Sequence, residues 1–198
     1  MQIHARGAAL LLQDLQNDLI KGSRPVQPLD GATLIANCCS LLATARSLDM
    51  PVIHVRTSRR PDLKDLPHQP LGSKPFSGTQ TLIEGTWGSQ IVSEIEIRPE
   101  DPVVTKHTTS PFHTTDIGVY LRRFGITTLV LTGYSTTGVV ESMLRDARDF
   151  DYQCVVARDC CAAPTAQEHE VCMDIVFPRM AWVASIGQIV SCLLYTSD

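Results

Sequence analysis

The chain has 198 residues, of which 43% are hydrophobic, with 17 Lys and Arg residues against 21 Asp and Glu residues. This length and composition favour a single globular domain over residues 1–198. The net charge of -4 argues against the basic face that nucleic-acid binding requires. No apolar run approaches the roughly 18 to 20 residues of a membrane span. We therefore expect no nucleic-acid partner and no membrane contact.

The seven cysteines do not show the paired spacing of a zinc site. Most lie in apolar surroundings, where a free Cys behaves as a small hydrophobic residue. The N-terminal residues leave no room for a secretory signal before the first strand-like run. These features predict a cytoplasmic protein with reduced thiols. The abrupt end of the sequence leads us to expect a non-native tail over residues 190–198.

Short apolar runs rich in branched residues recur along the chain and predict strands buried on both faces. They cover residues 8–13, 51–55, 103–105, 127–131, 153–157 and 181–185. Apolar residues spaced three or four apart predict helices over residues 31–48, 114–123, 139–150 and 167–177, the last ended by Pro178. The alternation predicts an α/β fold with a parallel sheet and helices on both faces.

The segment from Ser58 to Thr86 interrupts this alternation. It is rich in Pro, Gly and charge and has no clear period. It predicts a long surface loop, and such loops in compact domains often have a function.

Polar residues that follow the strands are the first candidates for chemistry, because ligands bind at the carboxyl ends of strands in an open parallel sheet. Asp14 follows the first predicted strand and Lys106 the third. Together they form a pair suited to proton transfer and charge stabilisation. Each also has an ordinary alternative, with Asp14 as a helix N-cap and Lys106 as a solvated surface residue.

The segment 133–138 predicts a tight turn from strand to helix, with two glycines and several hydroxyls. Such a turn presents backbone N–H groups to an anion or oxyanion, although helix capping by Thr136 or Thr137 explains it equally well. A nucleophilic hydroxyl would need an adjacent base, and no His neighbours the turn in the sequence.

The remaining candidate residues have structural explanations that weigh at least as much. Trp87 would line a pocket or pack in the core. Three histidines, His54, His107 and His113, lack the spacing of a metal motif.

Several stretches, in the same order along the chain, resemble the isochorismatase-like superfamily of cysteine hydrolases. They are Leu10–Asp18, Glu84–Gly88, Val103–Lys106 followed by Ser110–Thr115, and Gly125–Gly133 with the turn after it. The resemblance covers about residues 8 to 185. It implies a three-layer Rossmann-like sandwich with a six-stranded parallel sheet.

The resemblance also implies roles for individual residues. Asp14 and Lys106 would be catalytic, and the turn from Tyr134 through Ser135 and Gly138 to Val139 would form the oxyanion site. The implied donors are the backbone N–H groups of Ser135 and Val139, after a cis peptide bond between Tyr134 and Ser135. Substrate-binding residues would be Gln16, Trp87, Phe112 and Tyr134. Relatives assemble, so a dimer or tetramer is expected.

Two departures from the family pattern shape the functional prediction. Val139 stands where the family has its nucleophilic Cys, and the metal-binding residues of nicotinamidases have no match. The sequence therefore predicts a small-molecule hydrolase without metal or cofactor, in which Asp14 is the general acid/base and water the nucleophile. A vinyl ether such as isochorismate is the first substrate candidate. The alternatives are a silent ligand- or partner-binding member of the family and an amidase that uses water directly.

Overall fold

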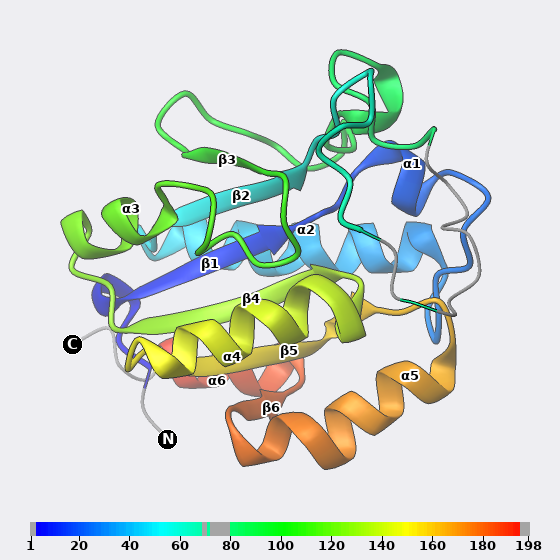
Figure 1. Cartoon of the computed structure of the whole chain (residues 1–198). Coiled ribbons are helices and arrows are strands. Elements are labelled where there is room, and N and C mark those ends of the chain that lie inside the picture. Colours follow the sequence, from blue (N-terminus) through cyan, green and yellow to red (C-terminus); the bar gives the residue numbers. More distant parts are fainter. Residues whose placement is uncertain (1–2, 69–70, 72–79, 195–198) are drawn as a thin grey trace.

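The computed structural model describes residues 3–68, 71 and 80–194, in which six strands alternate with helices (Figure 1). The strands are β1 (Ala8–Gln13), β2 (Val52–Thr57), β3 (Val103–Lys106), β4 (Thr128–Tyr134), β5 (Gln153–Ala162) and β6 (Trp182–Ala184). The α-helices are α1 (Asn17–Ile20), α2 (Gly31–Ser47), α3 (Ile117–Arg123), α4 (Glu141–Asp149), α5 (Ala166–Val171) and α6 (Ile186–Leu194). Shorter turns are η1 (Ala5–Gly7), η2 (Trp87–Ser89), the π-helical η3 (Thr136–Val140) and η4 (Cys172–Val176), and η5 (Phe177–Arg179).

All six strands form one parallel sheet in the order β3-β2-β1-β4-β5-β6. The predicted six-stranded parallel sheet is therefore confirmed. The order reverses direction between β1 and β4, which lie side by side at its centre. In sheets of this kind, the crevice at the carboxyl ends of two such strands is the usual ligand site.

Helices cover both faces of the sheet, as the sequence predicted (Figure 1). Residues of β1 alternate between two separate cores, with Leu10 and Leu12 in one and Ala9 and Leu11 in the other. The first core also contains residues of α2 and α6, and the second those of α3, α4, η4 and η5. Because β1 is buried on both faces, its residues 8–12 are all apolar rather than apolar at alternate positions.

The end of the last predicted helical segment differs from the prediction. α5 ends at Val171, and η4 and η5 continue the helical path through Pro178 as far as Arg179. The expectation that Pro178 ends the helical segment is therefore wrong. Proline lies near the start of η5, where its missing N–H is not needed for a helical bond.

The C-terminal helix α6 was not predicted, and it occupies part of the segment expected to be a tail. Ile189 and Leu193 of this helix are almost completely buried and belong to the core beside α2. The rest of the predicted tail, residues 195–198, lies outside the described residues. Within the described part of the chain, no helix has both the length and the apolar character to cross a membrane.

The predicted loop 58–86 is anchored at both ends, while its residues 69–70 and 72–79 lie outside the described residues. Arg59 forms a β-bridge with Ile83, and its N–H donates to the carbonyl of Leu82 at 2.9 Å. The N–H of Leu82 donates to Oδ2 of Asp18 at 2.7 Å. The loop therefore returns to the edge of the sheet from which it starts.

Candidate functional site

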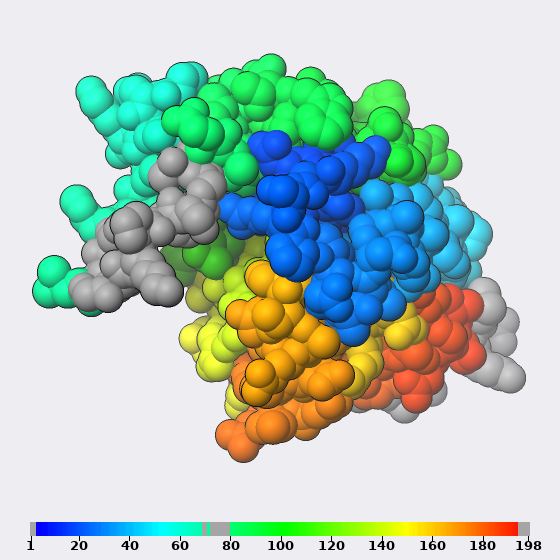
Figure 2. All heavy atoms as spheres, turned by 90° about the vertical axis from the view of Figure 1, so that its right-hand side faces the viewer, coloured from blue at the N-terminus to red at the C-terminus, as the bar shows by residue number. Residues whose placement is uncertain are grey.

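The carboxyl ends of β1, β2 and β3 bring three polar side chains together. Asp14 directly follows β1, Thr57 is the last residue of β2, and Lys106 is the last residue of β3. The register pairs Thr57 with Lys106 and Gln13 with Val55. Figure 2 shows this edge of the molecule, where α5 (orange) lies beside the blue segment after α1. A bridge between Gln27 and Ala163 joins the segment after α1 to the residues between β5 and α5.

The three side chains form a closed set of hydrogen bonds. Lys106 Nζ lies 2.8 Å from Asp14 Oδ2 and 2.5 Å from Thr57 Oγ1. The Thr57 hydroxyl lies 2.9 Å from the same oxygen of Asp14 and donates to it. The predicted association of Asp14 with Lys106 is thus present, and Thr57 is an additional member that the sequence did not reveal.

This ion pair is buried, with side-chain exposures of 9% for Asp14 and 2% for Lys106. Removing such charges from water is costly unless each is paired and hydrogen-bonded. Oδ2 of Asp14 has two donors, whereas Oδ1 is buried without a hydrogen-bond partner among the described residues. The arrangement therefore leaves one buried carboxylate oxygen without a hydrogen bond from the described residues.

Backbone geometry directs the Asp14 side chain into this position. Asp14 has a φ of 53°, in the left-handed region that Asp tolerates better than most residues. Its N–H still donates to the carbonyl of Val55 at 2.8 Å. Gln16, not Asp14, is the N-cap of α1. The structure thus contradicts both ordinary alternatives, because Asp14 is not that cap and Lys106 is not a surface residue.

Gln16 was predicted to bind substrate, but its side chain is fully buried and bonds to the main chain. Its Nε2 donates to the carbonyls of Thr57 and Ser89, each at 2.7 Å. Its Oε1 accepts the N–H of Thr57 at 2.9 Å. In this arrangement Gln16 holds the end of β2 in place, and a substrate could reach its amide only by displacing one of these bonds.

The turn after β4 begins beside Asp14. Gly133, which pairs with Gln13, has a φ of 126°, and a Cβ there would lie 2.0 Å from the Gln13 carbonyl oxygen. The peptide bond between Tyr134 and Ser135 is cis. Tyr134 is buried, and its hydroxyl donates to the Pro25 carbonyl at 3.0 Å. The turn therefore depends on close contacts with β1 and with the segment after α1.

The helical start at η3 has no side-chain cap. Ser135 is the N-cap residue and makes no side-chain capping bond, although its carbonyl accepts the N–H of Gly138 at 3.1 Å. Capping by Thr136 or Thr137 is thus not the reason for the hydroxyls in this turn. Val139 follows within η3, is 3% exposed, and packs in the same core as Leu11.

A buried histidine contacts this turn. Nδ1 of His169, in α5, lies 3.0 Å from Oγ1 of Thr136, and both residues are almost completely buried. Burial lowers the pKa of His169 to about 4, so the imidazole is neutral at pH 7. Sequence proximity could not reveal this pair, because the two residues lie 33 positions apart. One sequence signal was available. Thr165 and Glu168 form a capping box, which places the following residue, His169, in the first turns of a helix.

Two other residues predicted to bind substrate have different surroundings. The Phe112 ring lies 5.0 Å from that of Phe150 and 6.2 Å from that of Tyr152, measured between centroids. Tyr152 directly precedes β5, so this aromatic cluster lies where β5 begins, at the edge opposite Asp14. The structure thus places Phe112 away from Asp14, and its role in substrate binding stays a prediction. Trp87, in η2, is 59% exposed, and its carbonyl accepts a hydrogen bond from Asn17 at 2.9 Å.

The histidines considered as metal ligands each contact a different carboxylate. His54 lies 3.3 Å from Asp101 in the interior, and the other pairs are His107 with Asp65 and His113 with Asp146, each at 3.0 Å. Burial lowers the pKa of His54. In the described residues, no group of three or more His, Cys, Asp or Glu side chains could hold a metal ion.

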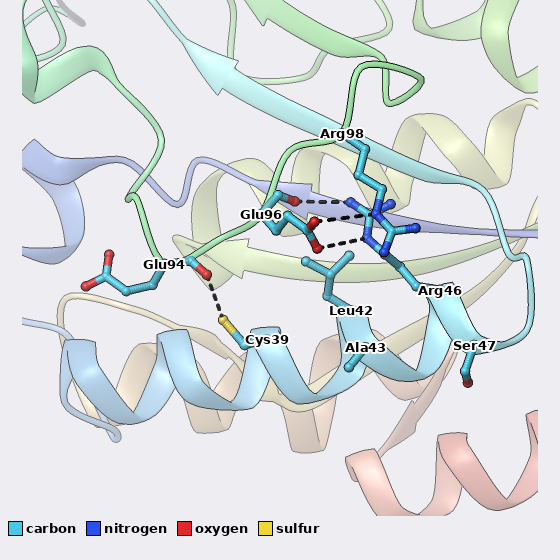
Figure 3. A pocket seen from close by; sticks show the side chains of 8 residues that line it. All are labelled: Cys39, Leu42, Ala43, Arg46, Ser47, Glu94, Glu96 and Arg98. Atoms are coloured by element: carbon cyan, nitrogen blue, oxygen red, sulfur yellow. Dashed lines mark hydrogen bonds and ion pairs between the residues drawn. The ribbon is translucent and has the colours of Figure 1, made fainter.

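A cavity of about 520 Å³ lies elsewhere, between α2 and the segment that precedes β3 (Figure 3). Several of its polar side chains bond to residues outside the lining, Arg46 to Asp101 at 2.5 Å and Glu94 to Lys21 at 2.8 Å. Glu96 lies 3.8 Å from Arg46 and 3.6 Å from Arg98, and the Cys39 thiol lies 3.3 Å from the Glu94 carbonyl. Burial raises the pKa of that thiol. This cavity contains no nucleophile with an adjacent base, so the Asp14 site remains the candidate for chemistry.

Comparison with known proteins agrees with this architecture. The uncharacterized isochorismatase family protein YecD of Escherichia coli O157:H7 is 30% identical over 193 residues, covering 98% of this chain and all of the relative. The ureidoacrylate amidohydrolase RutB of Pseudomonas syringae is 30% identical over 197 residues, covering 90% of this chain and 80% of the relative.

A solved structure of an isochorismatase family protein from Burkholderia thailandensis is similar over most of its length. It matches with a TM-score of 0.88 and 30% identity, covering 98% of both chains. The model of the isochorismatase domain family matches residues 8–188. The chain therefore belongs to the isochorismatase family.

Proposed function

We propose that this protein hydrolyses a small molecule at the Asp14–Lys106 site by direct attack of water, without a covalent enzyme intermediate. The observation that carries this proposal is the buried ion pair in which one oxygen of Asp14 is bonded twice and the other has no partner among the described residues. A buried carboxyl group with one free oxygen at a ligand-binding edge has the geometry of a general acid or base.

The two charged residues have separate roles in this proposal. Oδ1 of Asp14 exchanges the proton, since Oδ2 is already bonded to Lys106 and Thr57. Lys106 gives one N–H to Asp14 and one to Thr57, and its third N–H stabilises negative charge on the substrate. The backbone N–H groups of Ser135 and Val139 are proposed as further donors to that charge.

From the order of the motifs along the chain, we place the family's nucleophile position at Val139. Valine has no nucleophilic atom, so the proposed mechanism has no covalent intermediate at this position. Several buried thiols elsewhere are poor substitutes, because burial raises their pKa and disfavours the reactive thiolate. They are Cys154, Cys160, Cys161 and Cys172, although for Cys160 the largest cause is a hydrogen bond with Cys38.

A vinyl ether that carries carboxylates, such as isochorismate, is the first substrate to test. Asp14, protonated on Oδ1, would give its proton to the terminal vinyl carbon, whose double-bond electrons form the new C–H bond. Water then adds to the oxocarbenium carbon and returns a proton to Asp14. The hemiketal breaks its bond to the alcohol oxygen, its hydroxyl proton passes to that oxygen, and pyruvate and an alcohol are released. Each atom is accounted for, and Asp14 is regenerated.

Cationic side chains near the site favour a substrate that carries negative charge. Arg24 lies near enough to affect the pKa values of both Arg59 and Tyr134, although burial is the largest cause of each shift. Tyr134 follows Gly133, which pairs with β1 directly before Asp14. Together with Lys106, these side chains would attract a carboxylate.

Amide hydrolysis is the second candidate, favoured by the similarity to ureidoacrylate amidohydrolases. Here the Asp14 carboxylate would take a proton from water, hydroxide would add to the carbonyl carbon, and the proton would pass to the leaving nitrogen. The ionised form of Asp14 in the pair with Lys106 is suited to this role as a base. Ligand binding without turnover is the remaining alternative.

The decisive experiment compares the wild-type protein with Asp14→Asn on two substrates. Pyruvate release from isochorismate is followed with a coupled dehydrogenase, and ammonia release is followed on a panel of amides that includes ureidoacrylate. We expect turnover of one substrate by the wild-type protein and a loss of at least about 100-fold in Asp14→Asn, in line with removal of a general acid or base. Binding of both substrates by the wild-type protein without turnover would refute the hydrolase proposal in favour of a silent member.

A further inference from the structure

We infer that the hydroxyl of Thr57 is a positioning group for catalysis, which fixes Oδ1 of Asp14 as the oxygen that exchanges the proton. This inference rests on the proposed function and deepens it. Neither the residue type nor its position in the sequence pointed to Thr57, which ends β2 as one more branched residue of a buried strand.

The hydroxyl can bond in only one consistent way between its two charged neighbours. The ammonium group of Lys106 only donates hydrogen bonds, so Oγ1 of Thr57 accepts from it at 2.5 Å. The single hydroxyl proton is then directed at Oδ2 of Asp14, 2.9 Å away. Oδ2 also accepts from Lys106 at 2.8 Å. Lys106 Nζ, Thr57 Oγ1 and Asp14 Oδ2 thus form a triangle of three hydrogen bonds, and each bond involves a charged partner.

The consequence concerns which carboxylate oxygen faces the ligand. A carboxylate beside a lysine alone can rotate and present either oxygen, or share both with the ammonium group. With Thr57 as a second donor, the orientation in which Oδ2 receives both bonds is favoured. Oδ1 is the atom left without a partner in the described residues. A fixed orientation of the reacting atom reduces the entropy lost in reaching the transition state.

The backbone of Thr57 is fixed independently of its hydroxyl. Gln16 bonds to both the N–H and the carbonyl of Thr57, at 2.9 and 2.7 Å. Removal of the hydroxyl should therefore leave the end of β2 in place. This separation makes it possible to test the hydroxyl without disturbing the strand.

The test compares Thr57→Val, which keeps the branched shape, with Thr57→Ser, which keeps the hydroxyl. We expect kcat for the substrate identified above to fall about tenfold or more in Thr57→Val with KM changed less than about twofold, as for a group that acts mainly in the transition state. Thr57→Ser should recover most of the lost kcat. Thr105→Val is the matched control. Thr105 directly precedes Lys106 in β3, and its hydroxyl oxygen accepts from Nε of Arg56 at 2.9 Å and makes no hydrogen bond with Asp14.

A crystal structure of each variant provides a readout that does not depend on turnover. We expect Thr57→Val to show the Asp14 carboxylate rotated or in two orientations, and Thr57→Ser to show the wild-type orientation. An unchanged single orientation in Thr57→Val, or equal kcat losses in the Val and Ser variants, would overturn the inference. If the wild-type protein turns over no substrate, the hydrolase proposal fails, and the carboxylate orientation alone decides the structural role of Thr57.

Discussion

Replacement of His169 by Asn should reduce the loss of stability that the protein suffers as the pH falls below 7. Burial lowers the pKa of His169 from 6.5 to about 4 in the folded state. Nearby, Arg158 lowers this pKa further, while Asp159 and Asp174 oppose the shift. The unfolded chain therefore binds a proton at pH values where the folded protein does not, and protonation then favours unfolding.

The size of the effect follows from the two pKa values. Above pH 6.5 the imidazole is neutral in both states, and the stabilisation is fully present. This stabilisation is lost progressively as the pH falls towards 4. At about 1.4 kcal/mol per pH unit, the total loss from this residue is about 3 kcal/mol. Between pH 7 and pH 5 the expected loss from this one residue is about 2 kcal/mol. Urea unfolding at pH 7, 6 and 5 gives the free energy of unfolding as a function of pH. The effect of His169 is the difference between the slopes of this dependence for the wild-type protein and for His169→Asn.

The comparison of slopes removes the contributions of other groups. Carboxylates such as Asp101 and Asp174 also have lowered pKa values, so their protonation destabilises the folded protein as the pH falls. They are present in both proteins, and their contributions therefore cancel. Thr136→Val is the matched control, because it removes the hydrogen bond to His169 and leaves the imidazole in place. It should show the wild-type slope, since burial is the main cause of the shift. Parallel curves for the wild-type protein and His169→Asn would refute the reasoning.

Three further substitutions test the turn after β4. Gly133→Ala should destabilise the protein by about 3 kcal/mol or more in urea unfolding, because the new Cβ would lie 2.0 Å from the Gln13 carbonyl oxygen at a φ of 126°. The control Gly125→Ala, with a φ of 66° and nothing within 4 Å of the Cβ, should cost only about 1 kcal/mol. Equal losses of stability in the two variants would contradict this account. Tyr134→Phe should cost about 1 kcal/mol in the same assay through loss of the bond to the Pro25 carbonyl, and an unchanged midpoint would show that this bond contributes nothing. Val139→Cys should introduce weak amide hydrolysis if the site accepts an amide, and a variant whose thiol reacts with an alkylating reagent but hydrolyses nothing on a broad amide panel would count against that expectation.

The sequence alone identified the strands best where burial on both faces leaves little freedom. Residues 8–12 of β1 are all apolar because both faces are covered, and the prediction for residues 8–13 agrees with the bounds of the strand. The strands β4 and β5 extend three and five residues beyond the predicted ends, through Tyr134 and Ala162. These extensions include Gly133 and Asp159, residue types that local propensity assigns to turns.

The family motifs also located Asp14 and Lys106, and the structure brings them together as a buried pair. The missed helix α6 shows the opposite situation. Its start carries a capping box, in which the N–H of Gln188 donates to Oγ of Ser185 and the N–H of Ser185 donates to Oε1 of Gln188. The prediction did not use this short signal, and packing of Ile189 and Leu193 beside α2 stabilises the helix.

What the sequence by itself determined is the six strands, the four predicted helices, their alternation and the strand ends that carry charge. Periodicity and residue type specify these features, because they depend on neighbours along the chain. Only the tertiary structure decided which distant side chains meet. Thr57 joins Asp14 across 43 positions, and His169 reaches Thr136 across 33. Such contacts depend on strand order and register, which place residues far apart in the sequence at the same edge of the sheet and leave no local trace in the sequence.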